Sequence, residues 1–314
     1  EVKGKYASSQ WNECVGLTLE LSKDLRDEEK ASMLEWAAWA SAINGNEGLR
    51  KKLHREAATI WERMAVDSQN IVEKATYYSK AAWDYNYHQY EHGSLVDLTV
   101  DRQAKISCRN FAAKYWLEAQ GLSSDTEEKA RYCGRAATCY FLLLDETNGN
   151  RCVDLAKKAW ADLLPRLKGI IVSSIRSLSE EFIDDVVSLE DGVRESMKLT
   201  SRTFEEQVGM TENYRRWIES WVMKYNPKRL QLCFIEGMGS PVANSWIERK
   251  SEKEVEMHSL WVKKAFRRKG IATKFMTELF LRLRGDGYEQ VILDVAKDNL
   301  AAILLYKRLG FVVE

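Results

Sequence analysis

Hydrophobic positions in the first half of the chain follow the spacing of amphipathic helices. From Tyr6 to about Leu164, apolar residues recur every three or four positions, which places them on one face of a helix. Short segments rich in Gly, Asn and Ser separate these stretches, and such residues favour helix caps and turns. We expect helices at residues 11–25, 28–43, 51–66, 72–90, 102–120, 127–147 and 152–164.

Alanines beside large aromatic residues recur in these helices. Examples are Trp36-Ala37-Ala38-Trp39, Ala81-Ala82-Trp83 and Ala112-Ala113-x-Tyr115-Trp116. Small residues let two helices approach closely, and a neighbouring aromatic ring fills the gap. The pattern resembles a degenerate helix-pair repeat of the tetratricopeptide (TPR) kind, with irregular spacing. We therefore expect residues 1–168 to form an α-helical, solenoid-like domain, with an irregular helical bundle as the alternative.

The hydrophobic period changes near residue 168, after Pro165 and at Gly169, which together end a helix. The β-branched run at residues 170–175 is the first convincing strand. From there the pattern predicts a mixed α/β domain at residues 169–314. Its expected strands are 169–176, 230–236, 242–249, 254–262, 290–295 and one starting at Phe311, and its expected helices are 179–190, 211–225, 271–283 and 299–309.

Composition narrows the classes of function. Lys plus Arg and Asp plus Glu each number 47, so the formal net charge is zero. A general nucleic-acid binder would usually be basic, so no nucleic-acid partner is expected. No apolar run reaches the roughly 20 residues of a membrane helix, and no signal-peptide pattern opens the chain. The six cysteines include no CxxC pair, which is typical of reduced thiols in a cytoplasmic protein.

No metal site is expected from the motifs. His88 and His92 are four positions apart and would share a face of the helix expected at 72–90. A metal would need further ligands nearby, and the chain contains no HExxH motif. Inter-helix or surface histidines are therefore the simpler interpretation.

The stretch from Glu254 to Ala272 is the most informative in the chain. Its first part alternates polar and apolar residues, as a half-buried strand does. A basic turn around Gly270 follows, and then the amphipathic pattern of a helix. The unpaired N–H groups at a helix start and the helix dipole attract anions. This arrangement therefore predicts a phosphate-binding turn.

Two motifs in the C-terminal half are similar to those of the GNAT superfamily of acetyl-CoA-dependent N-acetyltransferases. The first is Arg267-x-x-Gly270-x-Ala272, and the second is Asn299-x-x-Ala302-x-x-x-Tyr306-x-x-x-Gly310-Phe311. The resemblance covers roughly residues 169–314 and implies a mixed α/β fold around a mostly antiparallel sheet. The family's usual seventh strand would follow the strand at Phe311, whereas the sequence ends at Glu314. The seventh strand is then missing from this sequence, disordered, or supplied by another chain. An incomplete sheet has an open edge through which the protein could form oligomers.

The resemblance implies acetyl-CoA as co-substrate and assigns roles in binding it. Its pyrophosphate would lie on the turn before the helix, and its pantetheine arm would pair with the strand as an added strand does. The residues implied for the turn are Arg267, Arg268, Lys269, Gly270, Ile271, Ala272 and Thr273, and those for the strand are Leu260, Trp261 and Val262. Asn299 would contact the cofactor or cap the helix that it precedes.

The chemistry of acetyl transfer needs a base for the amine and an acid for the thiolate. Protein-acetylating members of the family carry a glutamate where Glu256 stands, and burial would have to raise its pKa for it to work near neutral pH. Strand alternation would place Glu254, Glu256, His258 and Leu260 on one face, so His258 is the alternative base. Tyr306 matches the family tyrosine that protonates the departing thiolate.

The leading hypothesis is an N-acetyltransferase whose helical domain recruits a protein or peptide substrate, with direct attack in a ternary complex. The extra helical domain motivates this choice, although its aromatic residues are more simply explained by packing between helices. Two alternatives remain. One is a small-molecule amine acetyltransferase whose helices serve oligomerisation, and the other is a non-catalytic interaction protein that binds acyl-CoA.

Overall fold

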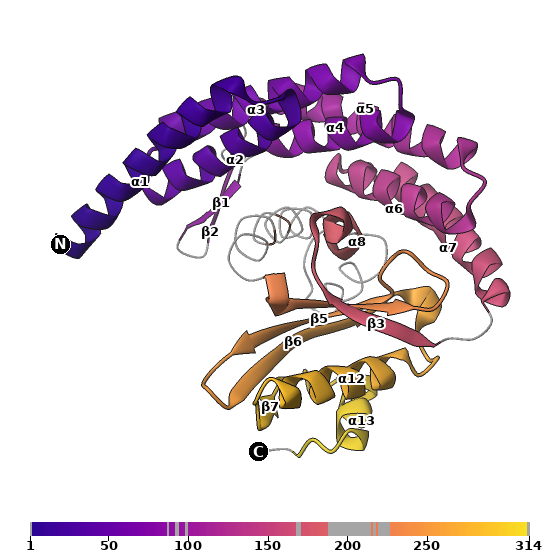
Figure 1. Cartoon of the computed structure of the whole chain (residues 1–314). Coiled ribbons are helices and arrows are strands. Elements are labelled where there is room, and N and C mark those ends of the chain that lie inside the picture. The colour runs from indigo at the N-terminus through magenta and orange to yellow at the C-terminus, as the bar shows by residue number, and fades with distance from the viewer. Residues whose placement is uncertain are drawn as a thin grey trace. The chain divides into compact units, whose positions relative to one another are not determined.

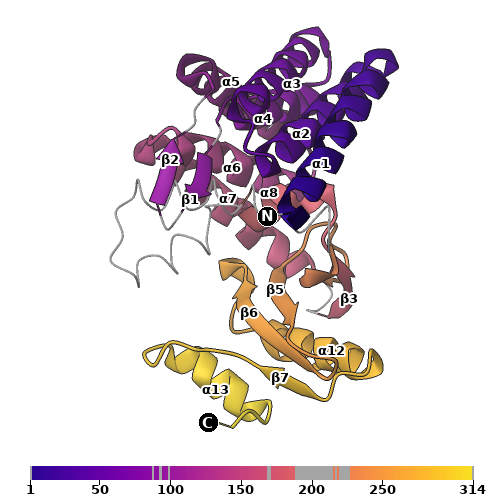
Figure 2. The same cartoon turned by 90° about the vertical axis from the view of Figure 1, so that its left-hand side faces the viewer.

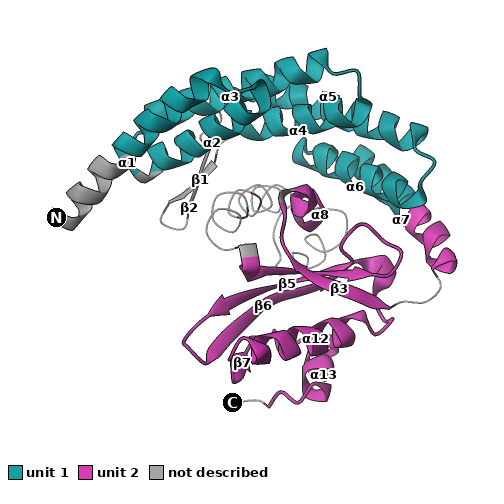
Figure 3. Ribbon diagram, in the orientation of Figure 1, with its two compact units in different colours: residues 1–156, 203–213 teal, residues 157–202, 214–314 magenta. Residues whose placement is uncertain are grey.

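The computed structural model describes residues 2–86, 88–91, 94–97, 100–167, 171–187, 215, 218 and 227–312. These residues group into two compact units, one up to Ala156 and one from Lys157 onward (Figure 3). The division falls within one helix, whose last turns belong with the C-terminal unit. The boundary between independently folding domains, which the sequence predicts near residue 168, stays a prediction. In the part of the chain described, no helix is long and apolar enough to cross a bilayer.

The N-terminal unit is built from helices that pack on their neighbours in sequence (Figure 1). They are α1 (Val2–Leu21), α2 (Asp27–Ile43), α3 (Glu47–Asp67), α4 (Ile71–Tyr85), α5 (Arg102–Leu122), α6 (Thr126–Leu142) and α7 (Glu146–Leu163). From α1 to α6, each helix packs against the next, as the helices of a solenoid do. The helical N-terminal half is confirmed, and its TPR-like character stays a prediction.

Aromatic rings stack across successive helix interfaces in this unit. The pairs are Trp61 with Tyr77 at 5.7 Å, Tyr78 with Tyr115 at 5.8 Å, and Trp116 with Tyr132 at 5.5 Å between ring centroids. The alanine pairs beside them, such as Ala57-Ala58 and Ala112-Ala113, are fully buried. Close helix approach at alanine and ring stacking at its edge therefore join α3 to α4, α4 to α5 and α5 to α6.

Helix α4 is shorter than the pattern predicted, and a hairpin follows it. The hairpin strands are β1 (His88–Glu91) and β2 (Ser94–Asp97), which pair antiparallel. The Tyr85 carbonyl accepts hydrogen bonds from the amides of Val100 and Asp101, so the chain returning to α5 ends the helix there. The prediction of a helix to residue 90 is wrong. His88 lies on a strand rather than a helix face, and His92 lies outside the described residues.

The break before α7 also lies earlier than predicted. The expected turn at residues 148–150 is wrong, because α7 already begins at Glu146. The Asp145 side chain caps α7 by accepting a hydrogen bond of 3.0 Å from a backbone N–H of its first turn. Gly149 is needed inside that turn, since a Cβ there would lie 2.2 Å from the ring of Phe141. The glycine marks close packing rather than a helix end.

The C-terminal unit contains a five-stranded mixed sheet in the order β3-β4-β5-β6-β7. Its strands are β3 (Val172–Ser177), β4 (Leu230–Ile235), β5 (Ala243–Arg249), β6 (Glu254–Val262) and β7 (Gln290–Ile292). The helices are α8 (Ile183–Val187), α12 (Ile271–Gly285) and α13 (Leu300–Arg308). All strand pairs are antiparallel except β6 with β7. The predicted mostly antiparallel sheet is confirmed.

The two faces of this sheet carry separate hydrophobic clusters. Phe182 and Ile183 from the α8 side pack with Leu230, Leu232 and Phe234 of β4. On the other face, Met257 of β6 packs with Met276 of α12 and Tyr306 of α13. In both views α12 and α13 lie on the same side of β5 and β6 (Figure 1, Figure 2). Successive side chains of β6 therefore point alternately toward one cluster and toward the other.

Three elements expected in this half either differ from the structure or lie partly outside the described residues. Of the expected helix at 211–225, only Arg215 and Ile218 are among the described residues. The helix expected at 179–190 is described only to Val187, as a 3-10 turn followed by α8. Phe311 and Val312 are not in a strand, because the chain there turns back onto α13, and Val313 lies outside the described residues.

We predict that Gly149→Ala destabilises the chain by about 1–3 kcal/mol, because the new methyl group would overlap the buried Phe141 ring. The matched control is Gly121→Ala in α5, where nothing lies within 4 Å of the added Cβ. Because alanine is the better helix former, the control should leave the thermal midpoint unchanged or raise it. Circular dichroism melts of the full chain measure both. Equal midpoints for the two variants would contradict the packing role.

Candidate active site

Strand β6 changes the face that its side chains occupy at a β-bulge. Trp246 of β5 pairs with His258, whereas Asn244 pairs with Trp261. Between these two pairs, one residue of β5 therefore lies opposite two residues of β6. Ser259 takes up the extra residue with a left-handed φ of 51°. Such bulges bend a strand and re-aim its side chains, and they often lie next to active sites.

The bulge corrects one expectation about this strand. Simple alternation placed Leu260 on the face of Glu256 and His258. Leu260 instead packs with Met257 and Tyr306, on the face covered by α12 and α13. The extra residue inverts the parity of every position after Ser259. The sequence did not predict the bulge, because its residue with positive φ is a serine and not a glycine.

Shortly before the bulge, the pairing of β6 with β7 ends. The pairing of β6 with β7 ends at Glu256 with Ile292, while β6 continues to Val262. On that side, residues 257–262 have no partner strand among the described residues. The Val262 carbonyl accepts a hydrogen bond of 2.8 Å from Arg267 Nε. An extended ligand could use the remaining backbone groups as an added strand does.

The basic turn has the backbone of an anion-binding site. Arg268 and Gly270 adopt left-handed φ values of 62° and 79°, and such turns direct successive N–H groups toward one concavity. The N-cap residue of α12 is Gly270, which has no side chain to cap the N–H groups at the helix start. A Cβ on Gly270 would meet nothing within 4 Å. Glycine is therefore needed there for its conformation, and the space above it is open.

The turn is anchored by buried groups that the sequence did not single out. Phe266, fully buried, packs edge-on against Trp160 at 5.7 Å. Lys263 lies over the same indole at 4.6 Å, and its Nζ is 3.8 Å from a carboxylate oxygen of Asp185 in α8. Both charged side chains are almost completely buried. Removing one partner of such a pair leaves an uncompensated buried charge, so this contact holds the end of β6 in place.

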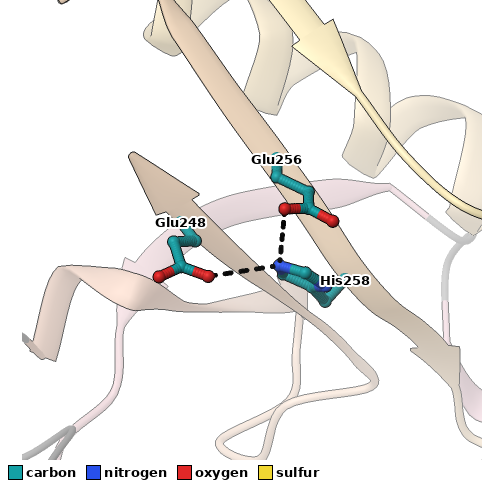
Figure 4. A group of neighbouring side chains, drawn as sticks. All are labelled: Glu248, Glu256 and His258. Atoms are coloured by element: carbon teal, nitrogen blue, oxygen red, sulfur yellow. Dashed lines mark ion pairs between the residues drawn. The ribbon is translucent and has the colours of Figure 1, made fainter. Parts of the chain in front are cut away.

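The two candidate bases lie on the opposite face from Tyr306, in a cluster that includes an unexpected third group. Glu256 and His258 of β6 face Glu248 of β5 (Figure 4). His258 Nε2 lies 3.6 Å from an oxygen of each carboxylate. The ammonium group of Lys250 contacts the same oxygen of Glu256 that faces His258. Glu248 could be found only from the register of the two strands.

The electrostatics of Glu256 run against its expected role. The hydrogen bond from Lys250, reinforced by the charge of His258, lowers the pKa of Glu256 below its usual value, although partial burial opposes this effect. A general base near neutral pH would need the opposite shift. The condition for that role, a pKa raised by burial, is not met, because the hydrogen bond from the ammonium group outweighs desolvation. Glu256 is therefore a stable carboxylate rather than a tuned base.

Tyr306 and Asn299 lie on α13. Tyr306 is 9% exposed, and its ring packs edge-on against Phe311 at 5.7 Å. Burial raises the pKa of Tyr306 above its usual value, so the phenol keeps its proton at neutral pH. The Asn299 side chain accepts a hydrogen bond of 3.2 Å from the amide of Ala302. Asn299 thus caps the helix, which is one of its two expected roles.

Comparison with known proteins finds a similarity to one family in this region. Residues 194–311 match the model of the acetyltransferase (GNAT) family. A curated relative, an uncharacterised N-acetyltransferase of Methanocaldococcus jannaschii, is 28% identical over 142 residues. The alignment covers 44% of this chain and 60% of the relative, so this chain spans less than two thirds of that relative's length.

Solved structures of similar proteins cover the same half of the chain. Ard1 from Thermoplasma volcanium is 25% identical, with 45% of this chain and 83% of that chain covered and a TM-score of 0.32. The PaiA N-acetyltransferase from Thermoplasma acidophilum, in complex with coenzyme A, is 17% identical, with 45% and 90% covered and a TM-score of 0.36. The similarity to the family rests on the match of residues 194–311 to the family model.

We predict that Lys250→Met raises the pKa of Glu256, because the hydrogen bond that stabilises the carboxylate is lost. The matched control is Lys253→Met, which removes a lysine of the same turn that pairs with Glu289 at 2.7 Å. A carbon-detected NMR titration of the glutamate side chains measures the shift, with Glu256→Gln assigning the signal. An unchanged Glu256 titration in Lys250→Met would contradict the pairing.

Proposed function

We propose that this chain, whose residues 194–311 are a GNAT acetyltransferase domain, transfers an acetyl group from acetyl-CoA to an amine of a protein or peptide. The observation that carries the proposal is the basic turn between β6 and α12. It combines two left-handed residues, an uncapped helix start and exposed cationic side chains within the region matched to the family. A doubly charged pyrophosphate is the ligand class that such a turn suits.

The donor would lie along β6 and across the turn. The N–H groups of residues 268–273 would hold the pyrophosphate, with Arg268 and Lys269 adding positive charge. The pantetheine arm would pair with the part of β6 beyond Glu256, where β7 no longer accompanies it. This path leads the thioester toward the bulge at Ser259. There the reacting carbon would lie at the strand edge, between the face with His258 and the face with Tyr306.

His258 is the base that the geometry supports best. Imidazole is a common general base in proteins, and Nε2 of His258 has no hydrogen-bond partner among the residues that the structure describes. In attack, the amine nitrogen bonds to the thioester carbonyl carbon while its proton passes to Nε2, directly or through water. The carboxylates of Glu248 and Glu256, each 3.6 Å away, stabilise the imidazolium that forms. Glu256 then acts through its charge.

Tyr306 would supply the proton for the departing sulfur. When the tetrahedral intermediate collapses, the carbon–sulfur bond breaks and the thiolate takes the phenolic proton. No covalent acyl-enzyme is needed. Cys233, on β4, is fully buried, and burial raises its pKa to about 12, so its thiol is a poor nucleophile. Direct attack in a ternary complex fits these groups.

The helical unit supports a protein or peptide acceptor over a free amine. Its sequential packing of helices is the organisation that other solenoids use to bind extended partners. Its stacked aromatic residues serve mainly packing, so recruitment would depend on exposed side chains. We place this activity in the cytoplasm, in keeping with six free cysteines. The short strand β7 at the sheet edge is where oligomers would form.

We predict that Tyr306→Phe lowers kcat roughly 100-fold, because the thiolate must then leave unprotonated. The matched control is Tyr288→Phe, at a half-buried tyrosine of the same unit outside both motifs. Thiol release from acetyl-CoA in the presence of a mixed peptide library measures kcat, and calorimetry checks that CoA affinity is unchanged. Equal rates for Tyr306→Phe and wild type would remove Tyr306 as the acid. CoA binding without thiol release for any acceptor would support the non-catalytic alternative.

We predict that Gly270→Ala weakens CoA binding about 5- to 30-fold. A non-glycine residue pays about 1–2 kcal/mol in the left-handed region, so the free turn would relax and binding would have to restore it. The matched control is Gly285→Ala at the other end of α12, where φ is not positive and the Cβ site is open. Calorimetric titration with CoA compares the two. Unchanged affinity in Gly270→Ala would argue against the turn as the binding site.

A further inference from the structure

Three potential metal ligands converge on the sheet face opposite Tyr306 (Figure 4). Glu248 of β5 lies directly across from Glu256 of β6, and His258 is two positions further along β6. Their nearest ligand atoms all lie within 4.8 Å of one another. His258 Nε2 is 3.6 Å from Oε2 of Glu248 and 3.6 Å from Oε2 of Glu256. Because the three residues lie on two paired strands, their side chains cannot move far apart.

The charges at this position favour a cation. Like charges directly opposite each other destabilise a pair of strands, so the two carboxylates need compensation. Lys250 supplies it by contacting Glu256, with its Nζ also 4.0 Å from Oε2 of Glu248. Arg229 lies 3.5 Å from the other oxygen of Glu248. Among the described residues, Lys250 is therefore the cation that balances the charge of the two oxygens that face His258. Its side chain is 42% exposed and able to turn away.

The imidazole has an unused nitrogen at the centre of the group. Nε2 of His258 is buried and has no hydrogen-bond partner among the described residues, since 3.6 Å is too long for a hydrogen bond. Buried polar atoms are normally paired. The Trp246 ring, 4.9 Å from the imidazole ring, packs against it and restricts its rotation. A lone pair held in this way is suited to bind a metal ion.

The spacing and chemistry suit a transition metal of the zinc class. Tetrahedral zinc with nitrogen and oxygen ligands separates neighbouring ligand atoms by about 3.4 Å. The two observed separations of 3.6 Å would need only a small adjustment. Calcium and magnesium prefer six or more oxygen ligands, whereas an imidazole with two carboxylates suits zinc. The two carboxylates also balance the charge of a divalent ion.

We propose that Oε2 of Glu248, Oε2 of Glu256 and Nε2 of His258 bind a divalent zinc-class ion, with Lys250 displaced and water completing the coordination. Lys250 and the ion compete directly, because both need Oε2 of Glu256. The bound ion occupies the lone pair of His258 that acetyl transfer would use, so it inhibits turnover. This inhibition rests on the proposed function, whereas the binding does not.

Zinc binding to the untagged full chain tests the site. Isothermal titration in a chelator-buffered solution should show one tight equivalent in the wild type. Glu248→Gln and His258→Gln should each weaken it at least about 100-fold, since even outer partners of a metal site contribute 10- to 100-fold. The matched control is Glu289→Gln, an exposed carboxylate paired with Lys253, which should bind as the wild type does.

Lys250→Met provides a test of opposite sign. Removing the competing ammonium should tighten zinc binding about two- to fivefold, the worth of an exposed ion pair, and misfolding cannot produce a gain. Cobalt(II) should give the visible bands of a tetrahedral site without a thiolate charge-transfer band. Zinc affinity that is unchanged in Glu248→Gln and His258→Gln, or a thiolate band that places the ion on a cysteine, would overturn the proposal.

Turnover measurements separate this proposal from the acetyltransferase proposal. Zinc should inhibit thiol release over the concentration range in which it binds, and Lys250→Met should be inhibited at lower zinc. Zinc binding without thiol release in the metal-free protein contradicts acetyl transfer alone. Thiol release without zinc binding contradicts the metal site alone. Full turnover with zinc bound contradicts the inhibition.

Discussion

The β-bulge at Ser259 is the constraint on which the candidate site depends. Up to His258, the side chains of β6 alternate between the face of α8 and the face of α12 and α13. The extra residue then transfers Leu260 to the face that carries Tyr306. Beyond Glu256, the strand also parts from β7. The parting from β7 and the bulge therefore follow each other closely along β6, with His258 on one face of the sheet and Tyr306 on the other.

The turn after β6 shows how packing holds a strained backbone in place. Arg268 adopts a left-handed conformation that costs about 1–2 kcal/mol for a residue with a Cβ. Such strain persists only where the surroundings determine it. Phe266 is fully buried against Trp160, and Lys263 pairs with Asp185 in a buried position. These contacts fix the chain on one side of the turn, and α12 fixes it on the other.

The helical unit and the Glu248–Glu256–His258 group differ in how their residues affect stability. In the helical unit, buried alanines and stacked rings give close packing without polar requirements. In the group, two carboxylates lie opposite each other beside an imidazole nitrogen that has no hydrogen-bond partner among the described residues, an arrangement that is unfavourable without compensation. Groups arranged at such a cost are characteristic of functional positions, which is why both the base and the metal proposals meet there.

The sequence alone determined much of this protein, because helix and strand periods are local. It predicted the helical half, the strands around β4 to β6, the basic turn with Gly270 and the helix that contains Tyr306. Local signals failed where a distant contact decided the outcome. Gly149 looked like a helix break, but the ring of Phe141 requires it, and α4 ends where the returning chain bonds to Tyr85.

Only the tertiary structure decided which of these residues meet. The bulge at Ser259, the position of Glu248 opposite Glu256, and the contact of Lys250 that lowers the pKa of Glu256 all depend on the register between two strands. A sequence shows which residues alternate along one strand, but a shift of one position moves each later side chain to the opposite face of the sheet. Register is set by packing across the whole sheet, and the chemistry of the site follows from it.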